Sequence, residues 1–223
     1  MSRRRFVIRA LVVVAMTLVA GLAIVLWYAA YDDLPQSGSV ALLESIMPAY
    51  EVQEVHSAHV DADPARVYAA IFEVTPGETA LARPFLWIRA LPSRLRGRKS
   101  ISDAVWKQPF VSISDTAILA RAPGREVVVG LIGKFWKLQG AEKVAVSSRD
   151  QFMSFDTPGF AVSTLSFHID PEAKGCRLTT VTRVRTTDAT SRREFRRYWR
   201  VIGTGSAVLR RTWLDALKAR AER

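Results

Sequence analysis

The feature that most constrains this 223-residue chain is an uncharged apolar run near its N-terminus, from Ala10 to Ala30. A run of about 20 apolar residues is typical of a membrane-spanning helix. Asp32 and Asp33 follow the run, and the basic residues that precede it are Arg3, Arg4, Arg5 and Arg9. Because basic residues flank a span on its cytoplasmic side, this pattern predicts a single-pass protein of the cytoplasmic membrane, with a cytoplasmic N-terminus and an extracytoplasmic C-terminal domain.

Two other interpretations of the segment stay open. A cleaved signal peptide also begins with basic residues, but its apolar core is usually only about 7 to 15 residues long. The best cleavage point, after Ala30, would place the bulky Tyr28 where a small residue is needed. The opening Ser2-Arg3-Arg4-Arg5-Phe6-Val7 also resembles a twin-arginine export signal. An uncleaved anchor accounts best for the length of the run.

The remaining residues are sufficient for one domain with a good core. We therefore expect an anchor over residues 1–31, a polar linker over 32–49 and a single domain over 50–223. No internal repeat is present. A single cysteine, Cys176, excludes an internal disulfide, so the core must hold the domain together.

The formal net charge of +11 is concentrated at the C-terminal end. Residues 185–223 contain 11 basic and four acidic side chains. Outside a membrane, anionic lipid head groups are a nearer partner for such a surface than nucleic acid, which we do not expect as a ligand. Arg192, Arg196 and Arg200 are spaced to share one helix face, and we expect them to contact the membrane surface. A solvated helix face is the alternative.

The pattern after the linker predicts a strand over 50–60 and then a helix, with Asp63 as its cap and Pro64 at its first position. A capping box at Thr75-Pro76-Gly77-Glu78 predicts a second helix, running toward Leu91. Hairpins are expected across Ala122-Pro123-Gly124 and across 171–175. A short helix over 149–155 lies between these hairpins.

The second hairpin alternates in character along both strands. Leu165, Phe167 and Ile169 point one way, whereas Thr164, Ser166 and His168 point the other. This alternation predicts a sheet with one buried and one solvated face, with His168 and Cys176 in outward or edge positions. From Asp188 the chain is predicted to be helical to its end, with a break at Gly203-Thr204-Gly205.

The order is strand, two helices, antiparallel strands and a long amphipathic helix. With the strand-to-helix entry Val60-Asp61-Ala62-Asp63-Pro64-Ala65-Arg66-Val67-Tyr68, it resembles the START-like and polyketide-cyclase-like superfamily, SRPBCC. The resemblance implies an α+β helix-grip fold, in which a curved antiparallel sheet wraps a long C-terminal helix. It also implies an apolar cavity between sheet and helix that binds a lipid or another hydrophobic molecule.

If this cavity exists, the strand alternation predicts which side chains line it. The candidates are His56, Leu165, Phe167, Leu178, Thr180, Thr182, Trp199 and Trp213. Buried hydroxyls of the two threonines would bond each other, water or a ligand. His56 is a weak candidate for a general base, and a core histidine paired with Glu54 is the stronger expectation.

Recognised catalytic and cofactor motifs are absent from the sequence, and no cofactor is predicted. His56 and His59 face opposite ways on a regular strand, so we expect no metal site from them. The leading hypothesis is a non-catalytic, membrane-anchored binding or carrier domain for a hydrophobic small molecule or lipid. A cyclase- or hydrolase-type enzyme using the same cavity, and an interaction module of an envelope assembly, are the alternatives.

Overall fold

The computed structural model describes residues 3–34, 40–79, 106–112, 116–137 and 142–223. The chain divides into two compact units, Met1–Ala30 and Tyr31–Arg223. The helix expected from Thr75 toward Leu91 begins as a short 3-10 helix, η1 (Pro76–Glu78), with its capping box formed. It ends at Glu78, because Thr79 has an extended backbone, and the predicted helical residues from 80 to 91 lie outside the described residues.

The first unit is a single helix, α1 (Arg3–Tyr28), where the sequence predicts a helix. Its described apolar side chains before the half-buried Tyr28 are exposed, among them Met16, Leu18 and Trp27. A search of the described residues finds no helix with the length and apolar character that crossing a membrane requires.

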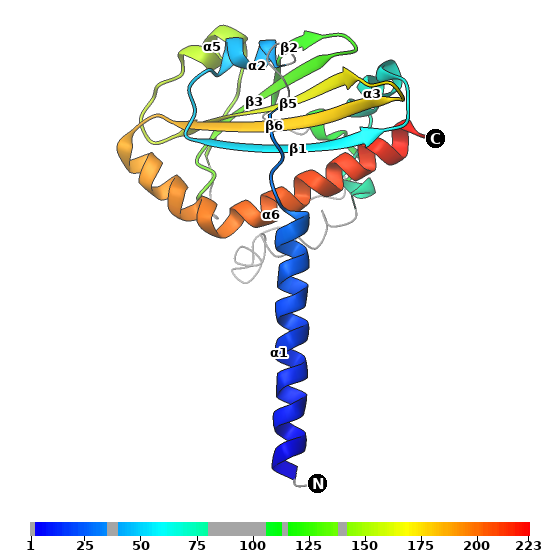
Figure 1. Cartoon of the computed structure of the whole chain (residues 1–223). Helices are drawn as coiled ribbons and strands as arrows, with labels where there is room; N and C mark the ends of the chain where they lie inside the picture. Colours follow the sequence, from blue (N-terminus) through cyan, green and yellow to red (C-terminus); the bar gives the residue numbers. More distant parts are fainter. Residues whose placement is uncertain (1–2, 35–39, 80–105, 113–115, 138–141) are drawn as a thin grey trace. The chain divides into compact units, whose positions relative to one another are not determined.

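The second unit is built on an antiparallel sheet of six strands in the described part of the chain. The order is β1-β6-β5-β3-β2 (Figure 1), and β4 pairs with β3. The strands are β1 (Val52–Val60), β2 (Ala117–Ala122), β3 (Glu126–Gly133), β4 (Lys143–Val144), β5 (Ala161–Pro171) and β6 (Cys176–Thr186). Both predicted hairpins, β2–β3 and β5–β6, are present. The predicted loop 171–175 separates β5 and β6, except that Pro171 is the last residue of β5.

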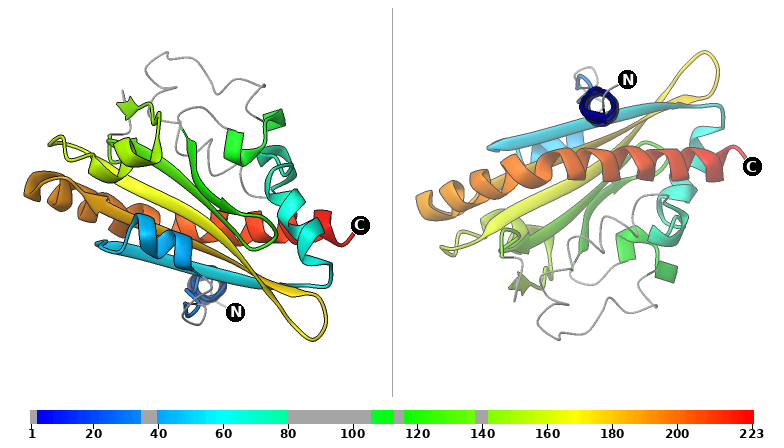
Figure 2. Two further views of the ribbon diagram at one scale, coloured as in Figure 1. Left: turned by 90° about the horizontal axis from the view of Figure 1, so that it is seen from above. Right: turned by 90° about the horizontal axis from the view of Figure 1, so that it is seen from below.

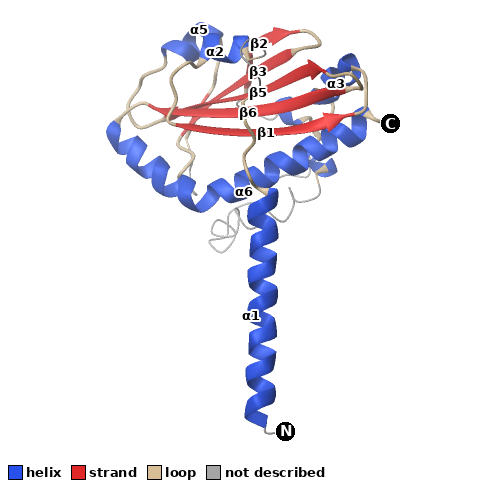
Figure 3. Cartoon of the chain, in the orientation of Figure 1, coloured by secondary structure: helices blue, strands red, loops and turns tan. Residues whose placement is uncertain are grey.

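Helices lie on both faces of this sheet (Figure 3). They are α2 (Ala41–Ile46), α3 (Pro64–Ile71), α5 (Arg149–Ser154) and α6 (Ala189–Ala221), with a 3-10 turn η3 (Phe110–Ser112). The predicted caps are confirmed. Asp63 accepts a bond from the amide of Ala65, and Asp188 accepts bonds from Thr190 and Ser191. The hydrogen bonds from Ser191 hold the pKa of Asp188 well below its ordinary value.

The 33-residue helix α6 crosses one face of the sheet (Figure 2). The predicted break at Gly203-Thr204-Gly205 is wrong, because α6 is continuous through these residues. An interior glycine costs a helix only about 1 kcal/mol, which packing against a sheet easily offsets. Gly203 is buried, and an added Cβ would lie 3.2 Å from Nε1 of Trp199. This glycine therefore gives the indole room beside the helix.

The core between α6 and the sheet joins α6, α3 and the inward side chains of the strands. Trp213, Leu214 and Leu217 of α6 pack there against Phe167 and Leu178. The sheet and the long C-terminal helix thus form the helix-grip arrangement that the sequence predicts. Cys176, expected at an edge, is fully buried in this core, and burial raises the pKa of its thiol.

The opposite face of the sheet is also buried, so the prediction of a solvated face is wrong. Helices α2 and α5 cover it, and Leu43 and Phe152 pack there against Val128 and Val181. This face is covered because a helix, α2, forms within residues 40–47, inside the segment predicted to be a polar linker. His168 on this face is fully buried.

Candidate functional site

A cavity of about 180 Å³ lies between the sheet and α6. The strands β3 and β5 supply its floor, and α6 and the η3 turn supply other walls. Its described lining residues are Phe110, Val111, Thr116, Val129, Gly130, Leu131, Ser163, Leu165, Arg210 and Trp213. Most of these side chains are apolar or small, so the cavity favours an apolar occupant.

Trp213 is the centre of the aromatic wall. Its ring stacks on Phe110 at a centroid distance of 3.9 Å and meets the edge of Phe167 at 5.1 Å. Its indole Nε1 is buried and has no hydrogen-bond partner among the described residues. The wall thus consists of packed aromatic rings and includes one buried N–H donor.

Arg210 adds a positive charge to this wall. Its guanidinium carbon lies 5.4 Å from the centre of the Trp213 ring, an arrangement typical of a cation–π contact. The Nε of Arg210 is buried and lacks a hydrogen-bond partner within the described ranges. Desolvation by burial lowers the pKa of Arg210, and the negative charge of Glu54 opposes that shift.

A polar cluster lies on the same sheet face, at the β1–β6 pair. Glu54 accepts a hydrogen bond from Ser206 of α6 at 3.0 Å, and its other oxygen lies 3.0 Å from Nε2 of His56. The ring of Tyr31 meets His56 edge-on at 5.5 Å. Burial, reinforced by the charge of Glu54, raises the pKa of Tyr31. The expected pairing of His56 with Glu54 is therefore present.

Three buried atoms of this region lack hydrogen-bond partners in the described part of the chain. They are Nδ1 of His56 and the Oγ1 atoms of Thr180 and Thr182. In the strand register, His56 lies opposite Thr180 and Glu54 lies opposite Thr182. The unpartnered groups therefore form one patch on the inward face, as expected for groups that bind water or a ligand.

The structure separates the side chains that the sequence places together in one cavity. Leu165 and Trp213 line the cavity. Phe167 and Leu178 are close-packed in the core beside it. The residues that share the sheet face without lining the cavity are His56, Thr180 and Thr182. Trp199 lines a different groove.

Arg210 is the residue that the sequence interpretation missed. It precedes Trp213, Leu214 and Leu217 by three, four and seven positions, which is the spacing of one helix face. A basic residue on an apolar stripe is the signal that could have identified it. The lining residues of η3 and β3 carry no such signal, because their positions depend on the tertiary packing.

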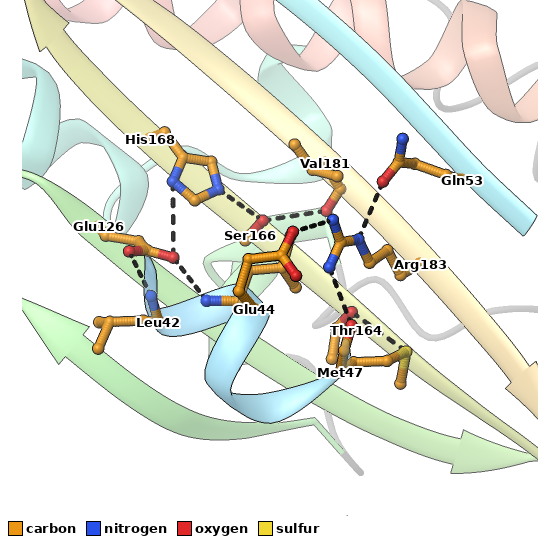
Figure 4. A network of polar contacts seen from close by, with 11 residues as sticks. Leu42, Glu44, Met47, Gln53, Glu126, Thr164, Ser166, His168, Val181 and Arg183 are labelled. Carbon is orange, nitrogen blue, oxygen red and sulfur yellow. Dashed lines mark hydrogen bonds and ion pairs between the residues drawn. The ribbon is translucent and has the colours of Figure 1, made fainter. Parts of the chain in front are cut away.

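A second polar network lies under α2, on the opposite face (Figure 4). Glu126 of β3 accepts hydrogen bonds from the amides of Leu42 and Leu43 at 3.0 and 2.8 Å. Nδ1 of His168 is 3.5 Å from the same carboxylate. Desolvation raises the pKa of Glu126, and the two backbone hydrogen bonds oppose the shift. These contacts fasten the start of α2 to the sheet.

The end of α2 is held by Arg183, whose side chain is 1% exposed. Its guanidinium donates to Gln53 at 2.9 Å, to the carbonyl of Met47 at 2.9 Å and to Glu44 at 2.5 Å (Figure 4). It also lies 4.3 Å from the centre of the Tyr50 ring. All of these contacts are internal, so the network has a structural role.

The predicted membrane-contact arginines line a groove of about 660 Å³ at the start of α6. Arg192, Arg196 and Arg200 are exposed there, and Arg192 donates to Glu51 at 2.7 Å. The described lining also includes Val52, Ala189, Arg193, Arg197 and Trp199. Because Glu51 is its one acidic side chain among the described lining residues, the groove is strongly basic.

No family model matches the sequence, and no curated protein matches it. Solved structures similar to the chain include protein MLL2253 from Mesorhizobium loti, at 12% identity and a TM-score of 0.34, over 76% of this chain and 96% of that one. The di-domain ARO/CYC StfQ of the steffimycin biosynthetic pathway is 13% identical with a TM-score of 0.35, over 77% and 50%. Norcoclaurine synthase from Thalictrum flavum is 12% identical with a TM-score of 0.30, over 76% and 94%. Similarities at this level carry no argument about function.

Proposed function

We propose that the chain is a membrane-associated member of the SRPBCC superfamily and that its domain binds a hydrophobic small molecule or lipid between the sheet and α6. The observation that carries this proposal is the cavity of about 180 Å³ that is lined, among others, by Leu131, Leu165 and the Trp213–Phe110 pair. Binding of an apolar ligand in such a cavity is favourable, because it removes apolar surface from water.

The arrangement favours binding over catalysis. His56, the residue that the sequence offers as a general base, does not line the cavity. Its Nε2 is engaged with Glu54. A general base must come within hydrogen-bond distance of the proton that it removes. A cyclase or hydrolase using His56 would therefore have to bind its substrate beside the β1–β6 pair.

Native mass spectrometry of the whole chain tests the binding function. We expect the protein to retain an apolar mass, or to acquire one on incubation with a lipid extract. Ser163→Leu, which adds volume within the cavity lining, should lose that mass. Ser154→Leu, the same change at an exposed serine on α5, should keep it. A wild-type protein that stays free of ligand after incubation would contradict the proposal and favour an interaction module.

We also propose that the domain is extracytoplasmic and held at the cytoplasmic membrane by the segment 10–30. The support is the charge pattern around this segment and the exposure of the described apolar side chains of α1. Alkaline carbonate extraction of cell membranes tests the attachment. Retention in the membrane pellet is expected, and release into the supernatant would contradict it.

A second candidate function, docking on anionic lipid, is favoured by the basic groove of α6. Residues 31–223, with folding checked by circular dichroism, should float with vesicles that contain phosphatidylglycerol and not with phosphatidylcholine alone. Replacing Arg192, Arg196 and Arg200 with Gln should abolish flotation. Replacing the exposed residues Arg66, Lys143 and Arg223 with Gln should leave most of the flotation. Equal losses of flotation in the two triple variants would contradict a specific docking surface.

A further inference from the structure

Arg210 is partly exposed, but its Nε is buried and its position on the helix is one that an apolar side chain would be expected to fill. It belongs to the helix face of Trp213 and Leu217, and it lines an otherwise mostly apolar cavity. Transferring a charge into such a region is costly unless a counter-charge and hydrogen bonds accompany it. The buried Nε of Arg210, which has no hydrogen-bond partner among the described residues, is therefore the feature that packing alone does not explain.

The nearest acidic group is already engaged. The oxygens of Glu54 contact His56 and Ser206, and Glu54 acts on Arg210 only through its charge. No carboxylate of the described residues lies within ion-pair distance of Arg210. The next residue provides the contrast, because Arg211 donates to the carbonyl of Ser57 at 3.1 Å and to Asp32 at 3.0 Å.

Resting on the proposed binding function, we propose that Arg210 binds the anionic group of the cavity's ligand, and that this ligand is a hydrophobic carboxylic acid. A guanidinium presents paired N–H donors that match a carboxylate. The apolar part of the acid would lie against the aromatic wall of Trp213 and Phe110.

The volume indicates how large a part of the acid the cavity can hold. A cavity of 150 Å³ is sufficient for benzene, so about 180 Å³ suits an apolar group of one or two rings or a short acyl chain. Suitable matched probes are 2-naphthoate and its neutral isostere 2-naphthamide, which differ in charge and scarcely in shape.

Isothermal titration calorimetry of the whole chain measures the affinities for 2-naphthoate and 2-naphthamide. A titration into the same solubilising agent without protein is the blank. We expect wild-type protein to bind 2-naphthoate at least about 10-fold more tightly than 2-naphthamide, the effect of one charge-assisted hydrogen bond. Arg210→Met should bind both probes equally, because it keeps the stem and removes the charge. Arg66→Met, which replaces an exposed arginine of α3 outside both the cavity and the basic groove, should keep the wild-type preference.

The outcomes separate the two proposals. Equal binding of both probes by the wild type overturns the role of Arg210 and leaves the binding function standing. Binding of neither probe overturns the carboxylate assignment, and the absence of a retained apolar mass then overturns the binding function too. If Arg210→Met does not fold, the same titrations of Arg210→Lys test the role of Arg210. A weakened preference for naphthoate supports the proposal, and an unchanged preference overturns the paired-donor contact.

Discussion

Replacing Arg183 with Ala is expected to lower the free energy of unfolding by about 3 kcal/mol, the lower end of the range for disrupting a buried ion pair. The side chain is 1% exposed and donates hydrogen bonds to Gln53, Glu44 and the carbonyl of Met47. Its removal would leave buried acceptors without a donor and a void between β6 and α2. Since Glu44 is partly exposed, solvent can satisfy it, and the loss stays at this lower end.

Urea denaturation of the whole chain, followed by tryptophan fluorescence, measures the effect. Arg192→Ala is the matched control, because Arg192 pairs with Glu51 at the surface, where an ion pair contributes at most about 1 kcal/mol. Arg183→Met should fall between the two variants, because it restores apolar volume without the donors. Equal losses for Arg183→Ala and Arg192→Ala would show that the network under α2 does not stabilise the domain.

Arg183 also shows where the sequence was insufficient for predicting the fold. The alternation of β5 and β6 correctly assigns residues to two faces, and the hairpins and caps follow from local patterns. The alternation does not show that a polar face is covered. Arg183 and His168 have polar side chains, yet both are buried. Arg183 contacts Met47 at the end of α2, and His168 contacts Glu126 of β3. The apolar residues Leu43, Ile46 and Met47 have helical spacing and are the signal for α2.

The candidate site was predictable to a similar extent. The inward face was correctly identified, because it follows from the two-residue period of a strand. The location of the empty space on that face was not, since it depends on which large side chains fill the rest. Phe167 and Leu178 close-pack with the core around Trp213, and the cavity lies toward β3 instead. Volume left between side chains is a tertiary property that no local pattern records.

Gly175→Ala is expected to destabilise the chain by about 3 kcal/mol, through a backbone clash and an unfavourable backbone angle. Gly175 closes the β5–β6 hairpin with a φ of +71°, and an added Cβ would lie 2.1 Å from the carbonyl oxygen of Val60. Neither backbone can yield freely. Val60 ends β1, and Lys218 of α6 donates to the carbonyl of the preceding His59 at 2.9 Å.

Gly124→Ala is a closely matched control for Gly175→Ala. Gly124 has a φ of +75° in the β2–β3 turn, and an added Cβ would meet nothing within 4 Å. Gly124→Ala should therefore cost only the backbone strain, about 1 kcal/mol. The difference between the two variants in urea denaturation isolates the clash with Val60. If the two losses were equal, the hairpin would have room to move away from β1, and the β1–β6 edge beside Glu54 and His56 would be less rigid than its contacts indicate.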